Sequence, residues 1–548
     1  MPEHGIFGTA AAGDIRSASA IPRAETGITA FVGRTLKGPV NEPIAIASFA
    51  EFERHFGGLW QPATLSYAIE QYFDNGGRKA LVVRVANGAR PPTLNLPAGG
   101  GELRLVGVNP GSREYLRASV DYDGIGAGET DRFNLVLQRV RMPGTEHIED
   151  QEIERRVSVD PGAARFVADV LVHSRLARVA GAVPRARPES TQLASGVPAV
   201  RYASSNPDGD DGAQLTDYDV IGSASAATGL LALQGHGGFD LLCIPPLGRE
   251  QDVGLSTLLV AARFCRQHHA MLVVDPPAAW SSAHTALAAL RTWPFRSDNA
   301  VMYFPRILAF DRLRRRIETF GSAGAAAGML ARADESLPVW APAEGEEAVL
   351  RPGLKPALSV DTRDRGRLAQ AGINTLCTTR SGGMERLSAT TLGGASWGSA
   401  DWRHLAARRL ALFAVSSIEQ GSRWLLTAPS TPPTWERARR QVADFLGELD
   451  RAGAFAGGRA EESYFVICDE RVNRPESVGD GKINLLFGIA TARPATFHTW
   501  MITYHGGASR VRSVAVNRLA TSQERVEWEI ETAILAPTVG LAQLTGVP

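Results

Sequence analysis

Cysteine is scarce in this chain of 548 residues, and the four present, Cys243, Cys265, Cys377 and Cys468, lie far apart in the sequence. None forms a CxxC pair or stands at a spacing typical of zinc ligands, so we expect neither a metal site nor a disulfide framework. Net charge is also lacking, because Lys plus Arg and Asp plus Glu each number 58. This balance argues against a general nucleic-acid binder, which would carry a basic excess, and leaves little repulsion to oppose self-association.

Long apolar runs are missing as well. No stretch approaches the roughly 18 apolar residues that a membrane helix needs. Residues 1–20 lack the basic start and apolar run of a secretory signal. We therefore expect no membrane insertion and a soluble product made in the cytoplasm. A hydrophobic content of 44% with 21% charged residues is that of a folded protein, and the length predicts about two to four domains.

The N-terminal region predicts an extended segment followed by mixed helices and strands. Residues 1–27 are small, polar and aperiodic, which favours an extended arm. Ser48 stands at a helix N-cap with Glu51 three residues on, the pattern of a capping box. The predicted elements here are a strand at 28–34, helices at 48–58 and 64–77, and a strand at 79–86.

The composition changes at residues 89–101, which are rich in proline and glycine and indicate a domain boundary. Short alternating runs beyond it predict antiparallel strands, closed by an amphipathic helix at 161–181. Residues 89–215 thus read as a β-rich insertion into a larger α/β domain. From 217 onward strands alternate with helices, and the segments 239–246, 254–269 and 270–277 predict one βαβ unit.

Several catalytic motifs are absent or incomplete. Residues 479–483, GDGKI, lack the upstream glycine of a phosphate-binding loop, and no GxGxxG has the right spacing. The adjacent His268 and His269 favour a charged helix C-terminus rather than a metal site, because neighbouring helical side chains diverge. One enzyme hypothesis stays open. GASWG (394–398) matches GxSxG, which would make Ser396 the nucleophile of an α/β-hydrolase, with His498 or His505 as the base.

A long amphipathic helix is predicted at 434–453. Its apolar stripe indicates a core face. The stripe consists of Trp435, Ala438, Val442, Phe445, Leu446 and Leu449. The other face carries Arg437, Arg439 and Arg440 first, and then Asp444 and Glu448. This order opposes the helix macrodipole, so the face either is simply solvated or presents charge to a partner.

The ordered set of these segments resembles the contractile tail sheath family of phage tails, pyocins and extracellular injection systems. The N-terminal resemblance lies in TAFVGRTLKGPVNEPIAIASFAEFERHFGG and LSYAIEQYFDNGGRKALVVRV. The middle resemblance lies in FDLLCIPP, AMLVVDPP, NAVMYFPRI and GSAGAAAGMLARAD. The densest part comprises AGINTLCTTRSGGMERLSATTL, DWRHLAARRLALFAVSSIEQG, TPPTWERARRQVADFLGELDRAGAFAG, ESYFVICD and GKINLLFGIATARPATF.

The resemblance implies a multidomain α/β (α+β) fold, in which a mixed-sheet inner domain is built from both chain ends. The domains that we then expect are an extended arm at 1–21, core segments at 22–88 and 359–508, a β-rich outer domain at 89–215, an α/β middle domain at 216–358, and a C-terminal arm or extension at 509–548. The second core segment would face the tube.

The resemblance also implies what the protein does. Subunits of this family form stacked hexameric rings around an inner tube, and the sheath contracts to drive the tube through a target envelope. It implies baseplate and terminator or cap proteins as further partners, no cofactor, no metal, no catalytic residues and no nucleic-acid partner. Particles would assemble in the bacterial cytoplasm and end as virion tails or released injection particles. A non-contractile baseplate or structural protein is the other alternative.

Two sets of residues are candidates for assembly contacts. The charged face formed by Arg437, Arg439, Arg440, Asp444 and Glu448 is expected to contact the tube. The terminal arms are expected to add strands to neighbouring subunits, which is β-augmentation. The candidate strand residues are Ile6, Phe7, Ile15, Val514 and Val516.

Overall fold

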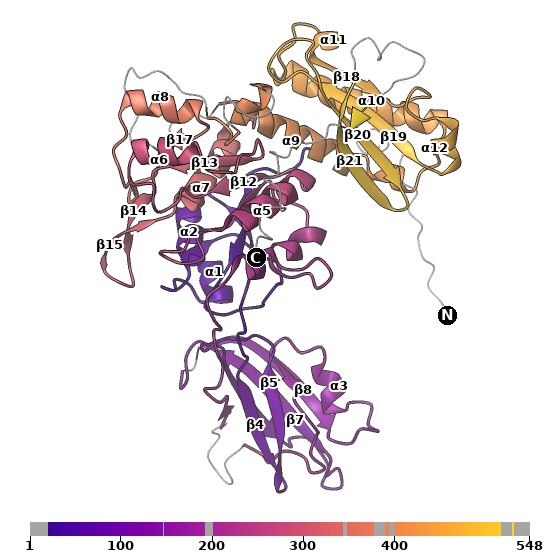
Figure 1. The fold of residues 1–548 in the computed structure, drawn as a ribbon. Coiled ribbons are helices and arrows are strands. Elements are labelled where there is room, and N and C mark those ends of the chain that lie inside the picture. The colour runs from indigo at the N-terminus through magenta and orange to yellow at the C-terminus, as the bar shows by residue number, and fades with distance from the viewer. Residues whose placement is uncertain are drawn as a thin grey trace, which may run out of the picture.

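The structure, a computed structural model, describes residues 20–145, 147–191, 201–342, 348–376, 389–393 and 400–516, together with the backbone of 529–530. Figure 1 shows three bodies. Helices surround a large sheet in the first, a β-rich body hangs below it, and a C-terminal body holds the long helix α10 against a second sheet. The fold is α/β with mixed sheets, as the sequence predicts.

The large sheet has seven strands in the order β17-β13-β12-β11-β1-β3-β2. Neighbouring strands are parallel except for β2, which runs antiparallel to β3. Every residue of β1 is buried, as expected of a central parallel strand covered on both faces. The strands are β1 (Ile28–Gly33), β2 (Ile44–Ile46), β3 (Lys79–Arg84), β11 (Leu241–Cys243), β12 (Met271–Val274), β13 (Ala300–Phe304) and β17 (Asn374–Thr375).

Helices cover both faces of this sheet. Side chains of β1 alternate between two apolar cores, since Ala30 and Val32 join one and Phe31 joins the other. The helices of the first core are α4 (Asp217–Ile221), the 3₁₀ helix η2 (Gly229–Gly235), α5 (Leu255–Gln267), α6 (Ala283–Leu290) and α8 (Thr362–Gln370). The helices of the second core are α1 (Phe49–Phe56), α2 (Thr64–Asp74) and α7 (Ala323–Ser336).

The start of α1 follows the sequence prediction closely. The Ser48 hydroxyl accepts a hydrogen bond from the backbone N–H of Glu51, 3.2 Å away. The Glu51 carboxylate in turn accepts from the backbone N–H of Ala47, 2.8 Å away, one residue before the position that a standard capping box uses. The helix ends where Gly57 adopts a φ of 89°, a left-handed conformation that glycine reaches without strain.

The run of small residues at 321–328 lets α7 lie directly on α2. A Cβ atom added at Gly324 would overlap the backbone oxygen of Ala68, and one added at Gly328 would overlap that of Tyr72. On α2, Leu65, Ala68, Ile69 and Tyr72 are buried, and Ala68 and Tyr72 lie at this contact. The glycines therefore set the distance between the two helices.

The β-rich body contains two antiparallel sheets around one core. One sheet is formed by β4 (Thr93–Ala98), β5 (Gly101–Gly107) and β9 (Ala177–Val179). The other has the order β10-β6-β7-β8 and is formed by β6 (Tyr115–Asp121), β7 (Arg132–Val140), β8 (Ile148–Ser158) and β10 (Ala203–Ser204).

The predicted helix at 161–181 is wrong. The structure has only the short helix α3 (Val167–Leu171), after which the chain turns and enters β9. The Ser174 hydroxyl accepts hydrogen bonds from the backbone N–H groups of Leu176 and Ala177, which stops the helix. The backbone of β9 then pairs with β5, so completion of a sheet overrides the helical periodicity.

Polar contacts hold the β-rich body to the large sheet. The chain enters the β-rich body after β3 and later returns alongside the same segment. There the backbones of Arg90 and Asp210 pair as in an antiparallel sheet. The buried Arg84 guanidinium at the end of β3 donates to the carbonyls of Gly38 and Pro110, so it links the two bodies. Lys37 also forms an ion pair with Glu149 of β8.

A hairpin projects from the first body (Figure 1). It is formed by β14 (Ile307–Asp311) and β15 (Arg316–Phe320), and β14 also pairs with the short strand β16 (Lys355–Pro356).

The C-terminal body packs helices on an antiparallel sheet with the order β18-β19-β20-β21-β22. The whole predicted apolar stripe of α10 is buried there, and Ile21 near the N-terminus joins the same core. The strands are β18 (Tyr464–Ile467), β19 (Ile483–Ile489), β20 (His498–His505), β21 (Ala508–Ala515) and β22 (Glu529–Ile530). The helices are η4 (Ala400–Arg403), α9 (Leu405–Gly421), η5 (Arg423–Leu426), α10 (Pro432–Arg451), α11 (Ala460–Ser463) and α12 (Pro475–Gly479).

The close approach of α2 and α7 predicts opposite effects for two glycine-to-alanine substitutions. Gly324→Ala should lower the free energy of unfolding by about 1–3 kcal/mol, because the new methyl group meets the α2 backbone. Gly366→Ala in α8 should raise it by up to about 1 kcal/mol, because nothing lies within 4 Å of the added atom and alanine favours helix. Thermal melts of the two variants check this, and equal melting temperatures would contradict it.

Candidate functional site

The exposed face of α10 carries the residues predicted to contact a tube, and its arginines already have partners within the chain. Arg439 donates two hydrogen bonds of 2.8 Å to the carboxylate of Glu436. Arg440 lies 3.1 Å from the same carboxylate, and the Arg437 guanidinium stacks 4.4 Å above the Trp424 ring. The three side chains are therefore oriented before any partner binds.

Glu436 is a residue that the sequence reading missed. It lies just beyond the first turn of α10, and its charge offsets that of the arginines that follow. Hydrogen bonding from Arg439 holds the pKa of Glu436 below its usual range. The spacing of Glu436 to Arg439 and Arg440, three and four residues, is the signal that predicts this pairing. Asp444 and Glu448 are exposed further along the same helix.

The candidate strand residues fall partly within the described chain. Val514 is buried in β21, at the position that pairs with Ile530 of β22. Val516 directly follows β21 and is half-buried. Ile6, Phe7 and Ile15 lie outside the described residues. The assignment of all five to contacts between subunits stays a prediction.

The hydrolase hypothesis depends on Ser396, which lies outside the described residues. Of its possible bases, His498 lies with its ring 3.8 Å from that of Trp402 and its Nε2 atom 3.3 Å from an Asp401 carboxylate oxygen. His505 is exposed at the end of β20. Within the described ranges, no group of three or more His, Cys, Asp or Glu residues is placed to hold a metal ion. No helix in those ranges combines the length and apolarity needed to cross a bilayer.

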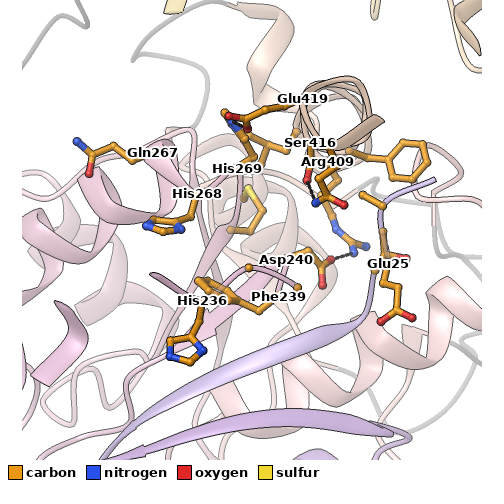
Figure 2. A pocket seen from close by; sticks show the side chains of 18 of the residues that line it. Glu25, His236, Phe239, Asp240, Gln267, His268, His269, Arg409, Ser416 and Glu419 are labelled. Carbon is orange, nitrogen blue, oxygen red and sulfur yellow. Dashed lines mark hydrogen bonds and ion pairs between the residues drawn. The ribbon is translucent and has the colours of Figure 1, made fainter. Parts of the chain in front are cut away.

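A cavity of about 590 Å³ lies where the first body meets the C-terminal body (Figure 2). Its walls come from the segment before β1, the segment 234–240 before β11, the end of α5, and α9. Its charged or titratable side chains include Glu25, Asp240, His269, Arg409 and Glu419, and Figure 2 shows them around one space.

Arg409 is the centre of a buried ion cluster at this cavity. Its Nη1 atom donates to Asp334 of α7 at 2.7 Å, and its Nη2 atom donates to Asp240 at 2.9 Å. Asp240 also accepts from the backbone N–H of Ile28 at 2.8 Å, where β1 begins. Burial raises the pKa of Asp240 to about 6, while the charge of Arg409 acts in the opposite direction. One guanidinium thus joins α9 to α7 and to two strands of the large sheet.

A second polar link crosses the same cavity. His269, just before β12, lies 3.2 Å from the carboxylate of Glu419 in α9, and Ser509 of β21 donates to that carboxylate at 2.7 Å. Burial raises the pKa of Glu419, but hydrogen bonds from His269 and Ser509 outweigh it and leave the pKa below its usual range. The Arg409 cluster and the His269–Glu419–Ser509 contacts thus hold the C-terminal body against the first body. The sequence reading did not single out Arg409, Asp240 or Asp334.

The Arg409 cluster predicts a pH-dependent stability defect. Arg409→Met should cost about 3–5 kcal/mol, because two buried carboxylates lose their counter-charge. A carboxyl group whose folded pKa is raised stabilises the fold at low pH and loses that contribution as pH rises through the folded pKa. Arg409 holds the pKa of Asp240 down, so its removal raises that pKa further, and the variant loses more stability than the wild type as pH rises. The defect should therefore be larger at about pH 8 than at about pH 5. Urea unfolding at both pH values measures it.

Arg440→Met serves as the control, since Arg440 is exposed and its ion pair with Glu436 is solvated. It should change the free energy of unfolding little at either pH. A defect of Arg409→Met that matches the control, or that shrinks as pH rises, would contradict the cluster's role.

Comparison with known proteins identifies the fold. No family model matches the sequence, and no curated protein does. Among solved structures, the sheath tail protein Lin1278 from Listeria innocua aligns with a TM-score of 0.58 and 12% identity, over 89% of this chain and 98% of that one. The contracted sheath of an extracellular contractile injection system, PVC, aligns with a TM-score of 0.50 and 15% identity, over 91% of this chain and 96% of that one. Over most of its length, the chain has the fold of the contractile sheath proteins.

Proposed function

We propose that this protein is the sheath subunit of a contractile tail or injection system. Subunits polymerise as stacked hexameric rings around an inner tube, and the polymer contracts to drive the tube through a target envelope. The likeness in fold to sheath proteins over 89–91% of the chain is the observation that carries the proposal. The work of the stroke comes from a change in packing between subunits, without a cofactor.

The N-terminal segment supports the proposed linkage of subunits. Ile21 is buried in the C-terminal core, and the backbone N–H of Ala24 donates to the Ser417 hydroxyl of α9 at 2.9 Å. A chain held at these two points can pass the residues before Ile21 to a neighbouring subunit. Pairing of such an arm with a neighbour's sheet is β-augmentation, in which main-chain hydrogen bonds supply the affinity.

The face of α10 suits contact with a tube that must later be released. Its charges are exposed or half-buried, and such solvated ion pairs form and break at little cost in free energy. The pairing of Arg439 and Arg440 with Glu436 holds them in place before contact, which reduces the entropy lost on binding. The partners of this proposal are the tube protein, baseplate proteins and a terminator or cap protein. Assembly takes place in the bacterial cytoplasm, and the product is a virion tail or a released particle.

Polymerisation tests the proposal and predicts the effect of removing the arm. The purified full-length protein should form long tubes in negative-stain images, whereas a baseplate protein should not. Deletion of residues 2–20 should leave a folded monomer that forms no tubes, because the contacts of Ile21 and Ala24 with α9 are kept.

Deletion of residues 2–27 is the comparison, and it should also lower the melting temperature, since it removes Ile21 from the C-terminal core. Tubes formed by the 2–20 deletion would show that the arm is not an essential linker.

Charge reversal on α10 tests the tube contact. Substitution of Arg437, Arg439 and Arg440 by glutamate should impair assembly of the sheath on tubes by tenfold or more in yield, because the contact loses its positive charge. The monomer should stay folded, since Arg437 and Arg440 are exposed and Arg439 is only half-buried. Electron microscopy with the tube protein present measures the yield.

The matched control is the reversal of Arg363 and Arg367, which lie on α8 in the first body. That variant should assemble as the wild type does. Unimpaired assembly of the α10 variant would remove this helix from the tube contact.

A further inference from the structure

The β14–β15 hairpin carries an exposed apolar surface. Phe310, Leu313 and Ile317 are between 48% and 69% exposed, which is unusual for large apolar side chains gathered on one hairpin. Phe310 and Ile317 are direct cross-strand neighbours, so their side chains share one face of the hairpin. We call this the hairpin surface.

The turn of the hairpin is held by the buried carboxylate of Asp311. Asp311 is buried and accepts hydrogen bonds from the backbone N–H groups of Leu313 and Arg314, at 2.8 and 3.1 Å. Its other oxygen accepts from the Arg249 guanidinium at 2.7 Å, and that guanidinium stacks on the Phe320 ring. A turn fixed in this way loses little conformational entropy when it docks.

The rim of the hairpin surface is basic. Arg312, Arg314, Arg315 and Arg316 are all exposed around the turn. Arg312 forms an ion pair with Glu70, and Arg314 and Arg316 both pair with Glu318. Four arginines thus meet two paired carboxylates at the rim, and its net charge stays positive. The surface therefore presents apolar side chains ringed by positive charge.

A second exposed apolar surface lies on α4 and α5. Tyr218, Leu255 and Leu259 are between 40% and 86% exposed, and the two leucines lie four residues apart on one face of α5. Asp217 joins the two helices, since its carboxylate accepts from the backbone N–H of Gly254 at 3.0 Å and from the Thr257 hydroxyl at 2.9 Å. We call this the α4–α5 surface.

Acidic groups predominate at the rim of the α4–α5 surface. Asp217 and Asp219 flank Tyr218, and the exposed Glu250 precedes α5. Arg263 and Arg266 are exposed at the opposite end, about one and two turns beyond Leu259. The charge at the α4 end is thus opposite to that of the hairpin surface. The segment before α5 touches the base of the hairpin through Arg249, but the hairpin itself projects away from α5 (Figure 1). The hairpin therefore does not lie on the α4–α5 surface of its own chain.

We propose that the hairpin surface of one copy of this chain docks on the α4–α5 surface of a neighbouring copy. Apolar side chains would form the centre of the contact and opposite charges its rim, as in protein interfaces generally. Two different surfaces that meet make a head-to-tail contact, which closes into a ring or continues as a helix. This docking proposal depends on the proposed sheath function in one respect only, namely that the contact forms within the sheath polymer.

Cysteine cross-linking tests the contact in the full-length chain. The double variant Ile317→Cys/Leu259→Cys, treated with a short bismaleimide, should give a ladder of covalent multimers on denaturing gels. It and all its controls carry Cys377→Ser, since the other three native cysteines are buried. Each single variant should give at most dimers, because one site alone cannot extend a chain of cross-links. Both positions are exposed, so the fold should tolerate the substitutions.

The control variant is Ile317→Cys/Val172→Cys, whose second site is 55% exposed on the β-rich body. It should give no ladder. Tubes of the Ile317→Cys/Leu259→Cys variant without a ladder would overturn the contact and leave the sheath function standing. A ladder without tubes would support the contact and count against the sheath function. Cross-linking of the Ile317→Cys site to added tube protein instead of to a second copy would also overturn the contact.

Discussion

The buried charge of Arg409 ties together parts of the chain that are far apart in sequence. Its guanidinium reaches Asp334 on α7 and Asp240 before β11, and Asp240 also binds the backbone where β1 begins. A buried cation is tolerated only where counter-charges surround it, so α9 must lie where these carboxylates are. The position of the C-terminal body on the large sheet, and the cavity beside it, both follow from this constraint.

A second buried arginine, at the carboxyl end of a strand of the large sheet, plays a similar role for the β-rich body. Arg84 extends from β3 to the carbonyl of Pro110, so the β-rich body is also linked to the sheet by a buried guanidinium. A parallel sheet with helices close-packed on both faces deforms little, and the α2–α7 contact leaves no room even for a methyl group. In the proposed sheath, motion then occurs between subunits, through exposed charges and paired strands, while each subunit moves as a body.

Much of the fold could be predicted, because most segments with a clear apolar periodicity form the helix or strand that this periodicity indicates. The cap of α1 at Ser48 and the apolar stripe of α10 are both confirmed. The prediction of a helix at 161–181 was wrong, because the pairing of β9 with β5 outweighs the local helical periodicity of the sequence. The site was less predictable. Glu436 could have been found from its spacing to two arginines, whereas Arg409 lies 169 residues from Asp240, and no local pattern joins them.

A sheath subunit of the proposed kind does mechanical work by exchanging contacts between identical neighbours. A helical reconstruction of its polymer by cryo-electron microscopy, traced strand by strand, tests this most directly. The seven-stranded sheet should be complete within each subunit, while the C-terminal sheet should gain a strand from the arm of a neighbour. A sheet completed in every case by its own chain, with both termini folded back on the same subunit, would contradict it.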